Sequence, residues 1–362
     1  MLVGAVTVAA LVFHGWSRGQ LDAVVVLATT QRTPIAARLV RLLTDEPRVD
    51  EVFVAGQPTT LVRPGEGGGP WPAIVFVNGA TRAGRFHPDV RRLAQGLARA
   101  GFLVAVPELP GLRLGEITPA TTAALTRVGL AVVDRRDVRR GQVSFYGVSV
   151  GATLALLAAE TRALHGRVRA VGGEAPWVDL EKVVRLATTG YYGGMRYSTD
   201  PYVRLAVARS LAASLPQPSD HAKLLSRLEA VADADPQPLA TLRAVPRLDA
   251  GGRALVALLL NRDPGRFPTL YGGLPARVRG GIARLSPVLG ADRLDMPVEL
   301  ASAPHDRYFP PGESRSLARA SKHVRVTVTS TLTHAAPKLS LHAIGDLAAF
   351  DAFVVRFLRD AR

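Results

Sequence analysis

The segment Val143-Ser-Phe-Tyr-Gly-Val-Ser-Val-Gly-Ala-Thr-Leu-Ala-Leu-Leu-Ala-Ala-Glu160 determines how the rest of the chain is interpreted. It begins with a short β-prone run, passes through Gly147-Val-Ser-Val-Gly151, and continues as an Ala/Leu-rich run with helical spacing. A strand–turn–helix of this kind strains the backbone of the serine, and the two glycines leave space that a Cβ would fill. We therefore predict that Ser149 is a nucleophile raised above a sheet. A glycine-rich turn with an incidental serine is the alternative.

The composition limits the class of protein. The chain has 362 residues, of which 48% are hydrophobic and 21% charged, as in a globular protein with a sizeable core. It has no cysteine, which excludes disulfides, thiolate metal sites and thiol catalysis. The net charge of +15 would suit a polyanion or an anionic membrane surface. However, the arginines are scattered, with no basic run and no interleaved aromatics, so we expect no nucleic-acid partner.

The N-terminus is the one candidate membrane segment. Met1–Trp16 is apolar and uncharged but shorter than the ~18–20 residues that span a bilayer comfortably. It has no basic region or cleavage site typical of a secretory signal. A second apolar run follows at Ala23–Ala28. A marginal anchor, the remnant of a longer anchor and a helix packed on the protein body all stay open. The chain is thus expected to be either cytoplasmic or membrane-associated through residues 1–30.

From residue 49 onward, short apolar strands alternate with amphipathic helices. This alternation indicates an α/β class with a parallel, doubly wound sheet. The expected elements are an amphipathic helix at 33–43, a hairpin at 49–62 with its turn near 56–58, buried strands at 73–77, 102–106, 143–146 and 168–172, and helices at 90–100 and 118–133.

The alternation stops after the sixth strand. Residues 178–295 have helical periodicity with proline-rich breaks, which predicts a helical cap or lid inserted into the sheet domain; a separate helical domain of unrelated role is the alternative. Strand patterns resume at 297–301 and 323–329, and a helix at 345–358 closes the chain. The predicted organisation is therefore an N-terminal segment at 1–48, a core at 49–177 and 296–362, and a cap at 178–295.

A nucleophilic serine needs a base within hydrogen-bond reach and an acid to orient that base. Asp306 and His334 each follow a predicted strand, at the end where open α/β sheets carry their active residues. They also occur in the order serine, acid, histidine. Glu174 and Asp179, after the sixth strand, are alternative acids, and His87 is a candidate pocket residue.

The oxyanion formed during acyl transfer needs two N–H donors. We expect one from Val150, directly after the nucleophile, and the other from the loop Asn78-Gly79-Ala80-Thr81, with Ala80 preferred. Gly79 could instead simply end the strand. The aromatic residues Trp177, Tyr191, Tyr192 and Tyr197 are pocket candidates, with ordinary cap core as the alternative for each.

The segments AIVFVNGAT, FLVAVPELPGL, SFYGVSVGA, PVELASAPHDRYFP and TLTH together resemble the α/β-hydrolase superfamily. The resemblance covers residues 49–178 and 295–362 and is closest to bacterial esterase-like and dienelactone-hydrolase-like members, several of which have a hydrophobic N-terminal segment. It implies that Ser149 is the nucleophile, Asp306 the orienting acid and His334 the base, with no metal or organic cofactor.

Two positions depart from the family pattern. Asn78-Gly79 replaces the usual His-Gly, which changes the hydrogen bonding of that loop, and the nucleophile is serine where dienelactone hydrolases commonly use cysteine. The expected function is hydrolysis of small-molecule carboxylic esters through a covalent acyl-enzyme. An acyltransferase, a peptidase on the same triad and a non-catalytic binding protein of this fold are the alternatives.

Overall fold

The computed structural model describes residues 18–30, 44–231, 237–334 and 344–362, together with residues 38, 40 and 42. The apolar stretch Met1–Trp16 and most of the helix expected at 33–43 lie outside these residues. Among the residues that are described, no helix combines the length and apolar character that a membrane crossing requires.

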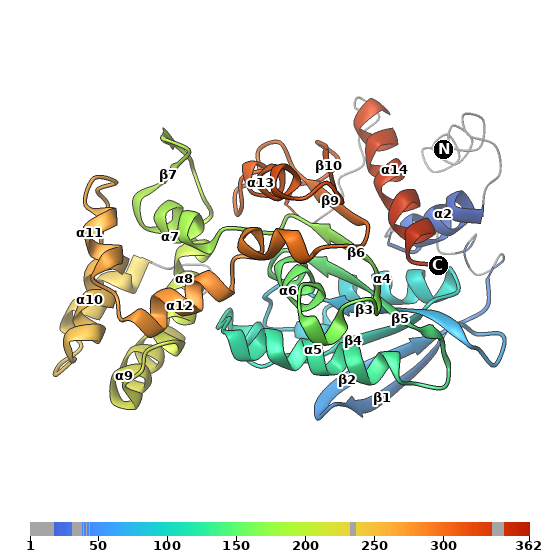
Figure 1. Cartoon of the computed structure of the whole chain (residues 1–362), viewed down its shortest axis with the longest axis horizontal. Helices are drawn as coiled ribbons and strands as arrows, with labels where there is room; N and C mark the ends of the chain where they lie inside the picture. Colours follow the sequence, from blue (N-terminus) through green and yellow to red (C-terminus); the bar gives the residue numbers. More distant parts are fainter. Residues whose placement is uncertain are drawn as a thin grey trace.

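A mostly parallel sheet forms the centre of the protein (Figure 1). Its strands lie in the order β1-β2-β4-β3-β5-β6-β9-β10. The β1–β2 and β2–β4 pairs are antiparallel and the other pairs are parallel, as expected for a doubly wound sheet that begins with a hairpin. The bounds are β1 Arg48–Val54, β2 Gln57–Arg63, β3 Trp71–Val77, β4 Leu103–Pro107, β5 Val138–Val148, β6 Val168–Glu174, β9 Val298–Ser302 and β10 Val324–Val328.

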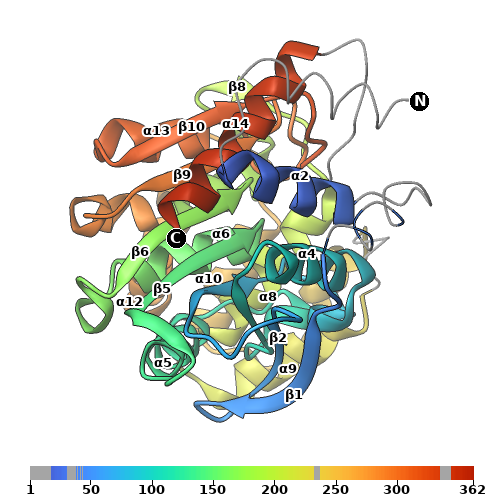
Figure 2. The same cartoon turned by 90° about the vertical axis from the view of Figure 1, so that its right-hand side faces the viewer.

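Helices cover both faces of the sheet, which explains why the strands are apolar throughout. In β3, Ile74 and Phe76 belong to one core cluster while Val75 and Val77 belong to the other. The first face packs against α2, α4 and α14, which lie close together in Figure 2, and the second against α5 and α6. These helices are α2 Arg18–Thr30, α4 Pro88–Arg99, α5 Pro119–Val133, α6 Val150–Ala159 and α14 Ile344–Asp360.

Helix α2 packs on the body of the protein. Its Ala23 and Val26 are buried in the core cluster shared with α4 and α14. The Asp22 carboxylate accepts a 2.8 Å hydrogen bond from Nε of Arg362, and the same guanidinium donates to the Ala100 carbonyl at 2.6 Å. The second apolar run of the N-terminus is therefore a packed helix, tied by an ion pair to the last residue of the chain.

The segment between β6 and β9 is mainly helical, as predicted, and lies at the end of the molecule away from α2 and α14 (Figure 1). A short hairpin of β7 (Tyr191–Tyr192) and β8 (Met195–Arg196), which was not predicted, lies between the first two of these helices. Gly193 and Gly194, both with positive φ, form its turn, and two such glycines favour a tight hairpin. The inserted helices are α7 Leu180–Thr189, α8 Pro201–Ala213, α9 Pro218–Glu229, α10 Ala250–Leu259, α11 Phe267–Gly272 and α12 Ala276–Arg284, with 3₁₀ turns η4 Gln237–Ala244 and η5 Pro287–Arg293.

A buried carboxylate joins this insertion to the sheet domain. Glu313 lies in α13 (Gly312–Ala320), a helix between β9 and β10 that the sequence analysis did not predict. It is fully buried and accepts hydrogen bonds from the backbone N–H groups of Val178 and Asp179, both at 2.8 Å, and from the Tyr192 hydroxyl at 2.8 Å. One acidic side chain thus fixes the start of the insertion and its hairpin.

Candidate active site

The turn between β5 and α6 has the strained geometry that the sequence predicted. Ser149 has φ 56° and ψ −125°, a conformation that few L-residues adopt. A Cβ on Gly147 would lie 2.3 Å from the carbonyl oxygen of Gly151, and one on Gly151 would lie 2.1 Å from that of Val77. The Ser149 N–H donates to the Glu174 carbonyl at 2.7 Å, which joins the turn to β6. Both glycines are therefore required by close packing of backbone on backbone.

The three side chains selected from the sequence meet at this turn. His334 Nε2 lies 2.9 Å from Ser149 Oγ, and His334 Nδ1 lies 2.8 and 2.9 Å from the carboxylate oxygens of Asp306. Asp306 is buried and also accepts the N–H groups of Tyr308 at 2.7 Å and Phe309 at 3.1 Å. This carboxylate is therefore held in place by its own loop while it contacts the imidazole.

Two tyrosines support the acid and the imidazole. The Tyr308 ring stacks on His334 with centroids 4.2 Å apart, and the Tyr197 hydroxyl donates to the Asp306 carbonyl at 2.5 Å. Tyr308 was not selected from the sequence, although its position two residues after the predicted acid was a signal. Tyr197, a pocket candidate from the sequence, connects the insertion to the acid loop.

The alternative acids have other partners. Glu174 is buried, and its Oε1 accepts the hydroxyl of Tyr146. Burial raises the pKa of Glu174 to about 7, although this hydrogen bond favours the ionised form. Asp179 caps α7 and pairs with Lys182 at 2.9 Å. The histidine thus contacts Asp306, the acid preferred from the sequence.

The residues proposed to supply the oxyanion donors line the same cavity as Ser149. Val150 is the first residue of α6, where backbone N–H groups have no partner within the helix. The loop after β3 passes close to the serine, since a Cβ on Gly79 would lie 3.5 Å from the Ser149 Cβ. Gly79, Ala80 and Val150 line the same cavity as Ser149. Asn78, which replaces the usual histidine, donates from Nδ2 to the Gly79 carbonyl at 2.8 Å and so shapes the loop.

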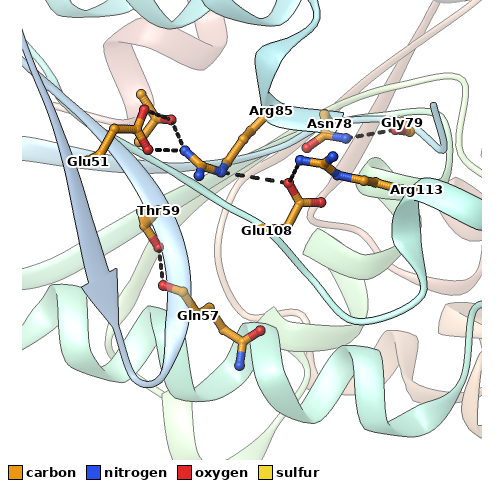
Figure 3. Close-up of polar contacts among 9 residues, drawn as sticks. Glu51, Gln57, Thr59, Asn78, Gly79, Arg85, Glu108 and Arg113 are labelled. Carbon is orange, nitrogen blue, oxygen red and sulfur yellow. Dashed lines mark hydrogen bonds and ion pairs between the residues drawn. The ribbon is translucent and has the colours of Figure 1, made fainter. Parts of the chain in front are cut away.

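A partly exposed charge network holds the continuation of this loop, as Figure 3 shows. Arg85, in the turn η1 (Gly84–Phe86), donates to the Glu51 carboxylate, and its Nη1 donates to Thr60 Oγ1 at 2.6 Å. On the other side its Nε lies 3.7 Å from Glu108, which accepts from Arg113 at 2.6 Å. These contacts connect the loop after β3 to β1, β2 and the end of β4. Glu51 and Arg113 reach solvent, and the two most buried charges, Arg85 and Glu108, have opposite signs.

A cavity of about 860 Å³ surrounds Ser149 and His334. Of the pocket candidates, Trp177 and His87 line it, whereas Tyr192 contacts Glu313 and Tyr197 contacts Asp306. Within the described residues, no group of three or more His, Asp or Glu side chains is arranged to hold a metal ion.

Comparison with known proteins finds solved structures of similar fold. The sequence matches no protein-family model and no curated protein. The rice cell wall degrading esterase LipA from Xanthomonas oryzae superimposes with a TM-score of 0.54 at 15% identity, over 86% of this chain and 89% of that one. Proline iminopeptidase from Mycobacterium smegmatis gives a TM-score of 0.47 at 17% identity, over 87% and 98%. Dienelactone hydrolase from Anabaena variabilis gives 0.45 at 14%, over 87% and 98%. At these identities, the likeness to the esterase establishes the fold.

Proposed function

We propose that this chain, which has the α/β-hydrolase fold, is a serine hydrolase that cleaves carboxylic esters or related acyl bonds. The observation that carries the proposal is the continuous contact from Asp306 through His334 to Ser149, with 2.8 and 2.9 Å between the bonded atoms. A hydroxyl is a weak nucleophile at neutral pH, and this arrangement is the one that activates it.

In the proposed reaction, Ser149 Oγ attacks the carbonyl carbon while His334 Nε2 accepts the hydroxyl proton. The N–H groups of Val150 and Ala80 stabilise the negative charge that develops on the carbonyl oxygen. His334 then donates the proton to the leaving alcohol, and the acyl group stays on Ser149. Water, activated by the same imidazole, releases the acid and restores the serine. Asp306 holds the tautomer in which Nε2 can accept the proton.

The insertion at residues 178–295 would act as a cap over this site. Its helices α7 and α8 contribute Leu180, Val184, Val203 and Val207 to the cavity wall. These apolar side chains exclude water from the acyl-enzyme and bind the non-reacting parts of the substrate.

Hydrolysis of p-nitrophenyl acetate tests the proposal. We expect turnover by the intact protein and a loss of at least about a thousandfold in kcat for Ser149→Ala, since the nucleophile is absent. Ser219→Ala, which removes an exposed hydroxyl in α9 outside the cavity, is the matched control and should retain full activity. A folded Ser149→Ala protein with unchanged turnover would contradict the proposal.

A further inference from the structure

The cavity around Ser149 extends in two directions. On one side it is lined by the inserted helices, through residues such as Val203 and Val207 of α8. On the other side the cavity extends between the helices α2, α4 and α14, which supply its walls there. We call this second part the α2 lobe and define it by Val26, Leu27, Leu93, Leu97, Val354 and Phe357. In Figure 1, α6, whose first residue follows Ser149, lies between α7 and α8 on one side and α2 and α14 on the other.

The α2 lobe is apolar and belongs to the core on one face of the sheet. Val26, Leu97, Val354 and Phe357 are members of the core cluster formed by α2, α4 and α14. The polar lining residues on this side include His87 and Asp89 at the start of α4, whose side chains are 39% and 53% exposed. Two buried polar side chains, Tyr146 and Glu174, also line the cavity, with the Tyr146 ring 5.0 Å from that of Phe357, but they are hydrogen-bonded to each other. The six residues that define the lobe are themselves hydrocarbon.

Attack on a carbonyl requires space only near Ser149 and the proposed oxyanion donors. The total volume of about 860 Å³ lies near the upper end of the range for small-molecule sites, which is about 300–1,000 Å³. Apolar space left empty destabilises a fold, because the side chains around it lose packing contacts. A lobe that runs away from the reacting atoms therefore suits a non-reacting part of the substrate.

On the basis of the proposed hydrolase activity, we infer that the substrate is an ester with an extended hydrocarbon chain and that this chain occupies the α2 lobe. Helix α2 supplies one wall, so residues 18–30, the described part of the candidate membrane segment, form part of the substrate site. The Asp22–Arg362 ion pair holds that wall against α4 and α14.

Two ester series test the inference. p-Nitrophenyl alkanoates from C2 to C10 lengthen the acyl group, and n-alkyl acetates lengthen the alcohol. We expect kcat/KM to rise by up to about fourfold per methylene in one series, the gain from burying one CH₂ group. The series that rises identifies which part of the ester holds the chain.

Substitutions that fill the cavity show where the hydrocarbon chain of the substrate binds. Leu93→Trp and Leu27→Trp fill the α2 lobe from two different helices, so they should reduce the C10-to-C2 ratio of kcat/KM by at least tenfold. Leu289→Trp, the same change at a leucine that is 67% exposed, should keep the ratio. Thermal unfolding confirms that each variant is folded. Two positions are substituted so that the test still holds if one of the variants does not fold.

Three outcomes would overturn the inference. Ala206→Trp fills the cavity from α8. If this variant lowers the C10-to-C2 ratio of kcat/KM while both α2-lobe variants keep it, the hydrocarbon chain binds on the side of the insertion. If C2 esters are cleaved and neither series rises, the substrate has no extended chain, and the hydrolase proposal still stands. If no ester is cleaved at all, both proposals fail together.

Discussion

The carbonyl oxygen of Val77 lies 2.1 Å from the position that a Cβ on Gly151 would occupy, so the end of β3 leaves no room for a side chain at the start of α6. The carbonyl oxygen of Asn78 lies 2.6 Å from the same point. Both neighbours are backbone atoms next to the proposed oxyanion loop and cannot rotate away.

Gly151→Ala should therefore either destabilise the protein by about 2–3 kcal/mol or displace the serine turn, with loss of activity in both cases. Urea denaturation and ester turnover measure the two effects. Gly272→Ala is the control, since nothing lies within 4 Å of its added Cβ. Wild-type stability and activity in Gly151→Ala would show that the turn has room for a Cβ at this position, contrary to the contacts above.

Removing the Glu313 carboxylate should loosen the insertion. Glu313→Ala leaves three donors without an acceptor, namely two backbone N–H groups and the Tyr192 hydroxyl, and each buried unsatisfied donor costs about 1–3 kcal/mol. We expect a loss of at least about 3 kcal/mol in the free energy of unfolding, with a smaller loss for Glu313→Gln, which keeps one oxygen acceptor. Exposed Glu66→Ala should stay within about 0.5 kcal/mol of the wild type. Equal stability of Glu313→Ala and Glu66→Ala would count against this role.

Glu174 should make stability depend on pH. Its pKa is raised to about 7 in the folded protein by burial, whereas an unfolded glutamate titrates near pH 4.3. Between these values the folded state holds a proton that the unfolded state has lost. The Glu174 contribution is thus present in full below about pH 4.3 and is lost as pH rises to about 7, a change of order 3 kcal/mol.

Glu174→Gln removes this titration. The stability of the variant relative to the wild type should therefore rise between pH 5 and pH 8, as measured by urea denaturation at each pH. Comparing the two proteins cancels the contribution of Glu160, whose pKa burial raises to about 8. A difference that is constant over this range would exclude a protonated Glu174 in the folded state.

Local patterns in the sequence predicted much of the fold. Continuous apolar runs predicted β3 and β4 because strands buried on both faces need apolar residues at every position. The hairpin β7–β8 was missed because two-residue strands have no measurable periodicity, and Gly193-Gly194 was its only signal. Helix α13 was missed because its nine residues include several polar ones.

The sequence predicted the candidate site residues whose positions follow from chain order and from the turn after a strand. It did not predict contacts between side chains of distant elements. Ser149, Asp306 and His334 each follow a strand, so a parallel sheet brings them to one edge. The roles of Glu313 and Arg85 depend on side chains crossing between elements, which no local pattern encodes. The α2 lobe depends on how three helices from opposite ends of the chain pack together.

Asp306→Asn tests the orienting acid. An amide in place of the carboxylate no longer fixes the imidazole tautomer, so kcat should fall by about 10³–10⁴ with little change in KM. Asp179→Asn, at the alternative acid, should lower kcat less than tenfold, because Asp179 caps α7. The reverse pattern in ester turnover would assign the acid to Asp179.

Covalent labelling with a fluorophosphonate probe tests the central claim most directly, because this probe reacts with activated serines and requires no knowledge of the substrate. Mass spectrometry of the labelled, folded protein should find one adduct, on Ser149, which should be absent in Ser149→Ala and greatly slowed in His334→Ala. A folded protein that takes up no probe, or takes it up on another residue, would contradict the assignment of Ser149 as an activated nucleophile.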